Sequence, residues 1–220
     1  MTVTITRLYD DYASAERAVR DLEVAGVPHN DISIVSNNAD SWYKGSSRAG
    51  TTTTPRTTTG RVDRDHDGLD DRAEGARAGA GIGATLGGAA GFLAGLGLLA
   101  IPGLGPVVAA GWLASTAVGA LAGGATGGII GALTQAGVRE EDAQLYAEGI
   151  RRGGTLVSAR VPDADRARYE SVLNRSAVNI IERGDAYRKG GWNRFDPNAA
   201  PFSADQIRKE RELYRRSSAA

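Results

Sequence analysis

The residues with the clearest chemistry form an acidic loop that begins at Asp63. Residues 63–74, DRDHDGLDDRAE, match the spacing D-x-D-x-D-G-x5-E of calcium-binding loops in full. In such loops carboxylates at positions 1, 3 and 5 surround the cation, a glycine at position 6 permits a sharp turn, and position 7 offers its backbone carbonyl. The sequence therefore predicts a Ca²⁺ site with these ligands: Asp63, Asp65, Asp67, Leu69, Asp71 and Glu74. The alternative is a solvated acidic segment that caps the helix expected after it.

The rest of the chain offers little catalytic chemistry. It has no cysteine and two histidines, His29 and His66, and neither histidine has a recognisable nucleophile as partner. Gly79, Gly81 and Ala84 satisfy a loose dinucleotide-binding spacing, but no strand is expected before them. The net charge is zero, which gives no reason to expect a nucleic-acid partner. We therefore expect a protein that is not an enzyme.

Two ladders of small residues lie within residues 78–138, a stretch that holds no charged residue. Residues four apart share one helix face, and repeated small residues at this spacing are typical of closely packed transmembrane helices. The sequence predicts two apolar helices, 78–101 and 107–136, joined by the turn IPGLGP at 101–106. The predicted helix-packing residues are Gly79, Gly83, Gly87, Gly91 and Gly95 in the first helix and Gly111, Ser115, Gly119, Gly123, Gly127 and Gly131 in the second.

The predicted hairpin has two possible settings. Its first helix would be roughly 35 Å long, which suffices to cross a bilayer core about 30 Å thick. The N-terminus does not resemble a signal peptide, so we expect the hairpin in the inner (cytoplasmic) membrane with the flanking segments in the cytoplasm. The many glycines make insertion only narrowly favourable. The alternative is a cytoplasmic homo-oligomer in which the same hairpin is buried between protomers.

The segments on either side of this stretch show patterns of strands and helices. Before it, strands at 2–6 and 31–35 flank a helix that Asp10 or Asp11 caps and Gly26 ends. After it we expect a helix at 140–151, a strand at 155–161, a helix at 163–173 and a strand at 178–181. Two β-α-β halves supply the strands and helices of a ferredoxin-like sheet. The expected fold class is therefore α+β, a split ferredoxin-like βαβ + βαβ domain interrupted by an apolar glycine-zipper helical hairpin.

The predicted organisation follows from these elements. The tail contains Trp192, Phe195 and Phe202, which either cover the domain or dock on a partner, and a capping box at 203–206 that opens a basic helix. The predicted segments are 1–36 and 138–184 for the two halves of the ferredoxin-like domain, 37–62 for a low-complexity linker, 63–74 for the acidic loop, 75–137 for the hairpin and 185–220 for the tail.

Several of these residues carry a resemblance to a known family. The runs AERAV at 15–19, AGVP at 25–28 and DISIV at 31–35, with GGTLV at 153–157 and NII at 179–181, resemble the bacterial heat-induced general stress proteins (17M-like). The resemblance covers about residues 1–36 and 138–184. It implies a small α+β stress-associated domain, sometimes with a glycine-rich membrane insertion, and it supplies no catalytic residues.

Together these patterns predict a non-enzymatic, stress-associated membrane protein that contacts lipid and forms a homo-oligomer through the glycine-zipper hairpin. Two alternatives stay open. One is a soluble homo-oligomeric assembly protein with buried zippers, and the other is a calcium or small-molecule sensor module.

Overall fold

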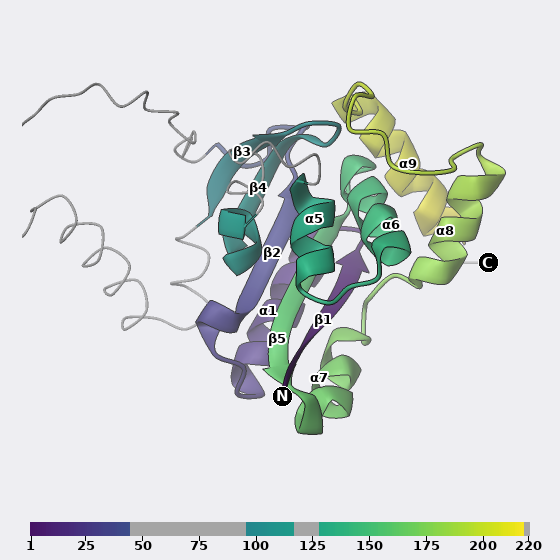
Figure 1. Cartoon of the computed structure of the whole chain (residues 1–220). Helices are drawn as coiled ribbons and strands as arrows, with labels where there is room; N and C mark the ends of the chain where they lie inside the picture. Colours follow the sequence, from purple (N-terminus) through teal and green to yellow (C-terminus); the bar gives the residue numbers. More distant parts are fainter. Residues whose placement is uncertain (45–95, 117–127, 218–220) are drawn as a thin grey trace, which may run out of the picture.

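The computed structural model describes residues 1–44, 96–116 and 128–217, and of residues 215–217 only the backbone. The described strands form one antiparallel sheet with the order β1-β5-β2-β4-β3 (Figure 1). The chain is thus a mixed α+β protein, as expected. The strands are β1 Thr2–Tyr9, β2 Ile32–Asn37, β3 Gly97–Ile101, β4 Gly105–Gly111 and β5 Thr155–Pro162.

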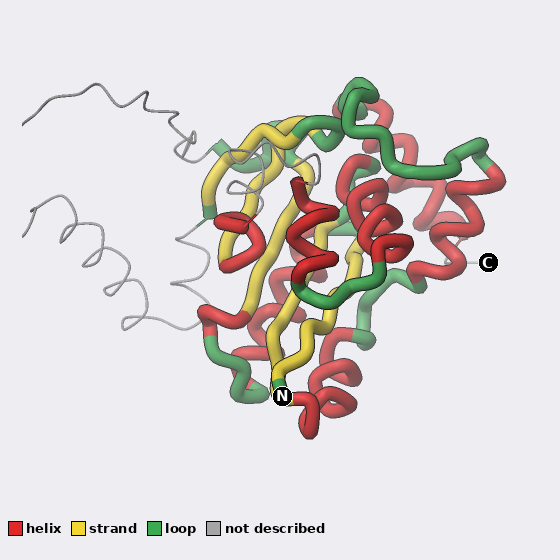
Figure 2. Tube along the Cα trace, viewed as in Figure 1, coloured by secondary structure: helices red, strands yellow, loops and turns green. Residues whose placement is uncertain are grey.

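Helices cover both faces of this sheet. Figures 1 and 2 show α1 and α7 behind the sheet, α5 and α6 in front of it, and α8 and α9 on the outer side of α6. The helices are α1 Tyr12–Val24, α5 Gly128–Gln135, α6 Glu140–Arg151, α7 Arg166–Leu173, α8 Ile180–Lys189 and α9 Ala204–Ser217, with short 3-10 turns at His29–Asp31 and Asp163–Asp165.

Alternate residues of each strand supply two hydrophobic cores, because successive side chains of a strand point to opposite faces. On β2, Ile32 and Ile34 pack toward α1 and α7, whereas Val35 packs toward α5 and α6. On the neighbouring β5, Leu156 and Val157 divide in the same way. Both faces of the central strands are therefore buried, and polar residues such as Ser33 and Ser158 are buried among the apolar ones.

The elements predicted on both sides of the apolar stretch are confirmed, except for the last strand. Helix α1 begins after Asp11, whose carboxylate accepts a hydrogen bond of 2.7 Å from the Ser14 backbone N–H. It ends at Gly26, whose φ of 103° suits glycine. Residues 178–181, however, do not form a strand. Asn179 caps α8 there by accepting hydrogen bonds from the backbone N–H groups of Ile181 and Glu182.

The predicted helical hairpin is wrong on both sides of its turn, although residues 112–116 and 128–135 of its second helix are helical. The turn lies at the expected place, but the residues on either side of it are β3 and β4 rather than two helices. The hairpin of strands pairs with β2, with Ser33 opposite Gly111 and Val35 opposite Ala109. This pairing satisfies the backbone groups of β2, which is otherwise a buried strand without a second neighbour. The ferredoxin-like arrangement is therefore not confirmed, because the predicted last strand is missing at 178–181 and β3 and β4 extend the sheet beside β2.

The same finding contradicts the prediction of two membrane-spanning helices. No helix within the three described ranges is long and apolar enough to cross a bilayer. Residues 97–101 of the first predicted span and 107–111 of the second belong to strands of the sheet. The expected location in the inner membrane thus has no support from the described residues, while residues 78–95 of the first span lie outside them.

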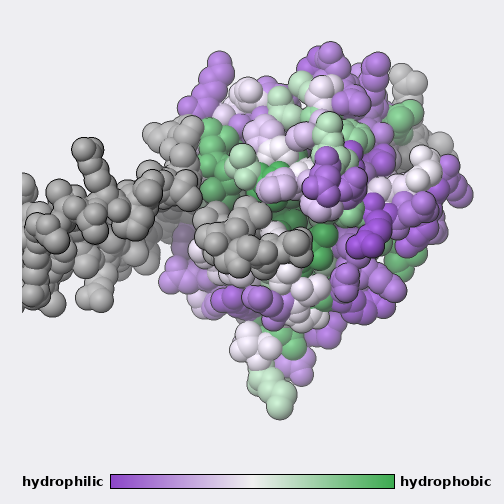
Figure 3. Space-filling view, turned by 45° about the horizontal axis from the view of Figure 1, so that its top comes forward, coloured by the Kyte–Doolittle hydropathy of each residue, from purple (hydrophilic) through white to green (hydrophobic). Residues whose placement is uncertain are grey.

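Hydrophobic side chains are not confined to the interior. In Figure 3 hydrophilic residues cover most of the described surface in view, and hydrophobic residues gather toward the left, on the side of β3 and β4. β3 is the last strand of the sheet, and its Leu98 and Leu99 are half-buried. The homo-oligomer that the sequence predicts is not tested by these observations and stays a prediction.

Candidate functional site

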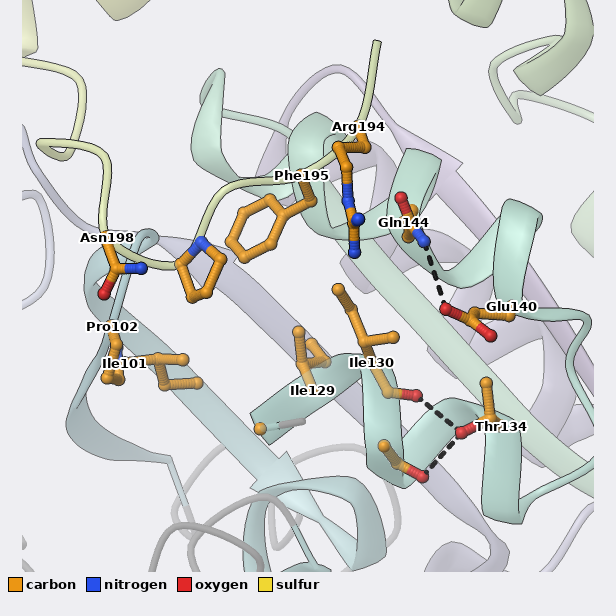
Figure 4. Close-up of a pocket in the computed structure, with 13 residues that line it drawn as sticks. Ile101, Pro102, Ile129, Ile130, Thr134, Glu140, Gln144, Arg194, Phe195 and Asn198 are labelled. Carbon is orange, nitrogen blue, oxygen red and sulfur yellow. Dashed lines mark hydrogen bonds between the residues drawn. The ribbon is translucent and has the colours of Figure 1, made fainter. Parts of the chain in front are cut away.

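A cavity of about 620 Å³ lies between the turn after β3, helix α5, the start of α6 and the segment that follows α8 (Figure 4). Its volume falls within the range of roughly 300–1,000 Å³ that is typical of small-molecule sites. The lining residues are Ile101, Pro102, Gly128, Ile129, Ile130, Gly131, Thr134, Glu140, Gln144, Arg194, Phe195, Pro197 and Asn198.

One side of the cavity is apolar. Ile101, Ile129 and Phe195 are almost completely buried and belong to the hydrophobic core between the sheet and α5 and α6. Figure 4 shows the Phe195 ring and the side chains of Ile129 and Ile130 facing the same space. This wall is therefore fixed by the core of the domain, and it offers an apolar body a surface that does not need to rearrange.

The other side is polar and carries two opposite charges. Gln144 donates a hydrogen bond of 3.2 Å to the carboxylate of Glu140, one turn earlier on α6. The Thr134 hydroxyl is already used, because it donates to the backbone carbonyls of Ile130 and Gly131. Glu140 and Arg194 form no ion pair with each other or with another residue in the described part of the chain. The cavity thus presents one carboxylate and one guanidinium that have no charged partner within residues 1–44, 96–116 and 128–217.

The segment 192–203, here called the strap, holds part of this wall in place. It crosses the turn between β3 and β4, where two glycines make room for it. A Cβ at Gly103 would lie 2.8 Å from the Phe195 ring and 2.8 Å from the Pro197 Cα, and a Cβ at Gly105 would lie 2.7 Å from the Pro201 Cβ. The Arg151 guanidinium also donates to the carbonyl of Ala200 at 3.3 Å. The turn IPGLGP is therefore the surface on which the strap lies.

The aromatic residues of the tail consequently cover the domain itself. Phe195 packs in the core, and Trp192 stacks edge-on against Tyr187, with 6.0 Å between ring centroids. Phe202 lies under the guanidinium groups of Arg151 and Arg152, at 4.9 and 5.4 Å from its ring centroid. Of the two roles that the sequence leaves open for these aromatics, the structure shows the first.

A buried network of charges anchors the helix that follows the strap. Glu148 on α6 is fully buried, and its carboxylate accepts hydrogen bonds from Arg152 at 2.7 Å and Arg151 at 3.3 Å. Arg152 also pairs with Glu210 of α9 at 3.2 Å. Arg211 donates to the carbonyl of Gly153 at 2.7 Å. These contacts join α9 to the end of α6 and thereby fix the far end of the strap.

The dependence of stability on alkaline pH tests the burial of Tyr187, which packs beside this network. Burial raises the pKa of Tyr187 to about 12, with Arg183 and Arg152 opposing the rise. The unfolded chain has a tyrosine pKa of about 10, so the folded state holds the proton between about pH 10 and 12. This part of the stability is complete below pH 10 and is lost as the pH rises toward 12, by up to about 1.4 kcal/mol per pH unit. We expect Tyr187→Phe to lose less free energy of unfolding over this range in urea titrations, and equal slopes would contradict the assignment.

A second, smaller cavity of about 510 Å³ lies near the start of α8. Its main charges are already paired, because the Arg183 guanidinium contacts Asp10 at 2.8 Å and lies 3.6 Å from the centroid of the Tyr214 ring. Arg183 therefore has a structural role, because it connects the residue after β1 with α8 and α9. The larger cavity, whose two charges have no charged partner among the described residues, is therefore the better candidate for a functional site.

Three of the predicted helix-packing residues, Gly111, Ser115 and Gly131, lie in the described part of the chain. Gly111 ends β4, Ser115 donates to the carbonyl of Trp112 at 2.8 Å, and Gly131 lies on α5, where a Cβ would meet nothing within 4 Å. The other members of both ladders lie outside the described residues: Gly79, Gly83, Gly87, Gly91, Gly95, Gly119, Gly123 and Gly127.

The predicted Ca²⁺ loop, residues 63–74, also lies outside the described residues, so its ligands stay a prediction. Within the described ranges no group of three or more histidine, cysteine, aspartate or glutamate side chains is arranged to hold a metal ion.

The lining residues of the cavity are mostly ones that sequence reasoning missed. Phe195 stood out as a tail aromatic, but Glu140 and Arg194 are separated by more than fifty positions and follow no known motif. The one signal in the sequence was the pair of glycines in the turn at 101–106, which made a close approach of another segment possible.

Comparison with known proteins assigns no relative to this chain: no family model, no curated protein and no solved structure matches it. The resemblance to the general stress proteins therefore stays a prediction.

Proposed function

We propose that this chain is a non-catalytic module that binds a small amphipathic molecule in the cavity beside the strap. The observation that carries the proposal is the division of one cavity into a buried apolar wall and a polar wall. Sites for small molecules are commonly built in this way, with apolar surface providing affinity and a few polar groups providing orientation. The proposal takes up the sensor alternative of the sequence analysis, without requiring a metal.

The side chains of the lining support binding more than catalysis. Among the lining residues that the structure describes, there is a single carboxylate, Glu140, and no histidine, cysteine, serine or lysine. The one hydroxyl in the described lining, that of Thr134, is engaged with its own helix. A nucleophile paired with a general base is the usual requirement for acyl or phosphoryl transfer. The lining offers no such pair, whereas it offers an amphipathic ligand both of the surfaces that it needs.

The test uses the full chain and the fluorescent probe 8-anilinonaphthalene-1-sulfonate, which has an aromatic body and one charge. Gly131 lines the cavity, and its Cβ position is open, so Gly131→Leu is expected to fill space without disturbing the backbone. We expect the full chain to bind one probe molecule and Gly131→Leu to bind it at least about tenfold more weakly, since the filled cavity no longer removes the probe from water.

The matched control adds the same side chain elsewhere. Ser171→Leu places it on the exposed side of α7, on the other face of the sheet. This variant is expected to bind the probe as the unmodified chain does. Equal weakening in both variants, or no probe binding by the full chain, would overturn the proposed function.

A further inference from the structure

The two charges of the cavity come from elements that are distant in the sequence. Glu140 begins α6, and Arg194 belongs to the strap, ten residues before α9 begins. Figure 4 shows both side chains at the same end of the cavity, with Gln144 beside them and the apolar residues below and to the left. Their charged groups lie more than the ion-pair distance apart, since no ion pair joins them. They are therefore separate binding points rather than a closed salt bridge.

Each charge favours a ligand group of the opposite sign. A guanidinium presents a planar set of donors that matches a carboxylate, often through two parallel hydrogen bonds. A carboxylate such as that of Glu140 accepts hydrogen bonds from an ammonium group. Gln144 holds this carboxylate at one oxygen and leaves the other oxygen available, because its hydrogen bond reaches only the first.

A ligand with only one charge would fit this site less well. An anion on Arg194 would lie near the Glu140 carboxylate, and a cation on Glu140 would lie near the guanidinium. The charges of the lining residues within the described ranges sum to zero, so a ligand with one charge of each sign leaves neither Glu140 nor Arg194 without a partner. The buried wall of Ile101, Ile129 and Phe195 then requires that the body between or beside the charges be apolar.

We propose that the cavity binds a zwitterion with an apolar body, that is, a hydrophobic amino acid or a dipeptide of two such residues. In this assignment Arg194 binds the ligand carboxylate, Glu140 binds the ligand ammonium, and the apolar side chains lie against Phe195 and Ile129. The volume of about 620 Å³ leaves room for two side chains, which favours the dipeptide. The inference rests on the proposed function, since it names the ligand class for the same cavity.

The experiment titrates the full chain by isothermal calorimetry with three probes: leucyl-phenylalanine, its N-acetylated form and its C-terminal amide. We expect the free dipeptide to bind most tightly and each capped form to bind about tenfold more weakly, as for the loss of one hydrogen bond to a charged group. Glu140→Gln and Arg194→Gln should each weaken the free dipeptide by a similar factor. Both side chains are exposed, so neither change should unfold the protein.

The pattern across variants and probes is the decisive result. Glu140→Gln should have little further effect on the N-acetylated form, which has no ammonium, and Arg194→Gln should have little further effect on the amide, which has no carboxylate. Glu141→Gln and Lys209→Gln remove exposed charges outside the cavity and should leave all three affinities unchanged. Capped and free dipeptides that bind equally well would overturn the zwitterion assignment.

The outcome also separates this inference from the proposed function. If the anilinonaphthalene probe binds in a way that Gly131→Leu blocks, but neither dipeptide nor free phenylalanine binds, the cavity is a binding site and the ligand class is wrong. If neither the fluorescent probe nor the zwitterions bind, both the proposed function and the inference fail.

Discussion

Replacing Gly111 with alanine is expected to lower the free energy of unfolding by about 3 kcal/mol or more, whereas Gly131→Ala is expected to raise it by up to about 1 kcal/mol. Gly111 has φ of 84°, and a Cβ there would lie 2.2 Å from the carbonyl oxygen of Ile32 and 2.8 Å from the Cα of Ser33. Both contacts are with the backbone of β2, so no side-chain rotation relieves them.

Gly131 lies in α5, with open space at its Cβ position. Alanine there lowers the conformational entropy of the unfolded chain and meets no neighbour, so the helix propensity of alanine should appear as a gain in stability. The two glycines belong to the same ladder in the sequence, and this makes them a matched pair. Packed helices that meet along that ladder would require a small residue at both positions.

Urea unfolding followed by circular dichroism of the two variants and the unmodified chain measures both effects. Opposite signs would support the strand pairing of β4 with β2. A similar loss of stability in both variants would instead favour the helical hairpin and would contradict the sheet described above.

Replacing Glu148 with alanine is expected to destabilise the protein by about 3–5 kcal/mol, because removing one partner of a buried ion pair leaves the other charge uncompensated. Glu148 is fully buried, and Arg151 and Arg152 both donate to its carboxylate. Arg152 also lies 4.4 Å from the centroid of the Tyr187 ring, so it cannot easily turn toward solvent. The loss should therefore extend to α9, which Arg152 holds through Glu210.

Glu141→Ala on the same helix is the control, because Glu141 is exposed and should change stability by no more than about 0.5 kcal/mol. Should Glu148→Ala fail to fold, Glu148→Gln retains the volume and one acceptor for Arg152 and is expected to show an intermediate loss. Denaturant midpoints at constant pH compare the three variants. A loss for Glu148→Ala no larger than that for Glu141→Ala would show that the network contributes little to stability.

The predicted elements succeeded where local patterns decide the structure. Strand β1, helix α1 and strand β2 follow from alternating apolar residues, from the Asp11 cap and from Gly26. Helix α6 and strand β5 were equally clear, because the two glycines Gly153 and Gly154 separate them. Each of these signals lies within a few residues of the helix or strand that it determines. The local sequence is therefore sufficient to predict these elements.

The predictions are wrong where contacts with residues distant in the sequence determine the conformation. Residues 105–111 are small and apolar enough for a helix or a strand, and only pairing with β2, more than sixty residues earlier, makes them β4. The run VNII at 178–181 looked like a strand, but Asn179 caps a helix that packs beside α6. In both places intrinsic preference was weak, so tertiary contacts chose the conformation.

The predicted acidic loop and the candidate site differ in what determines them. The loop follows from the sequence, whereas the site follows from the tertiary structure. The predicted Ca²⁺ loop is a contiguous motif, so its ligand spacing follows from the sequence alone, and so do the mixed α+β class and the places where the chain turns. The cavity depends on Glu140, Arg194 and the turn at Gly103 meeting in space. No local rule relates these residues, because their proximity is set by the strap lying on the turn between β3 and β4 and by the buried ion pairs that hold α9.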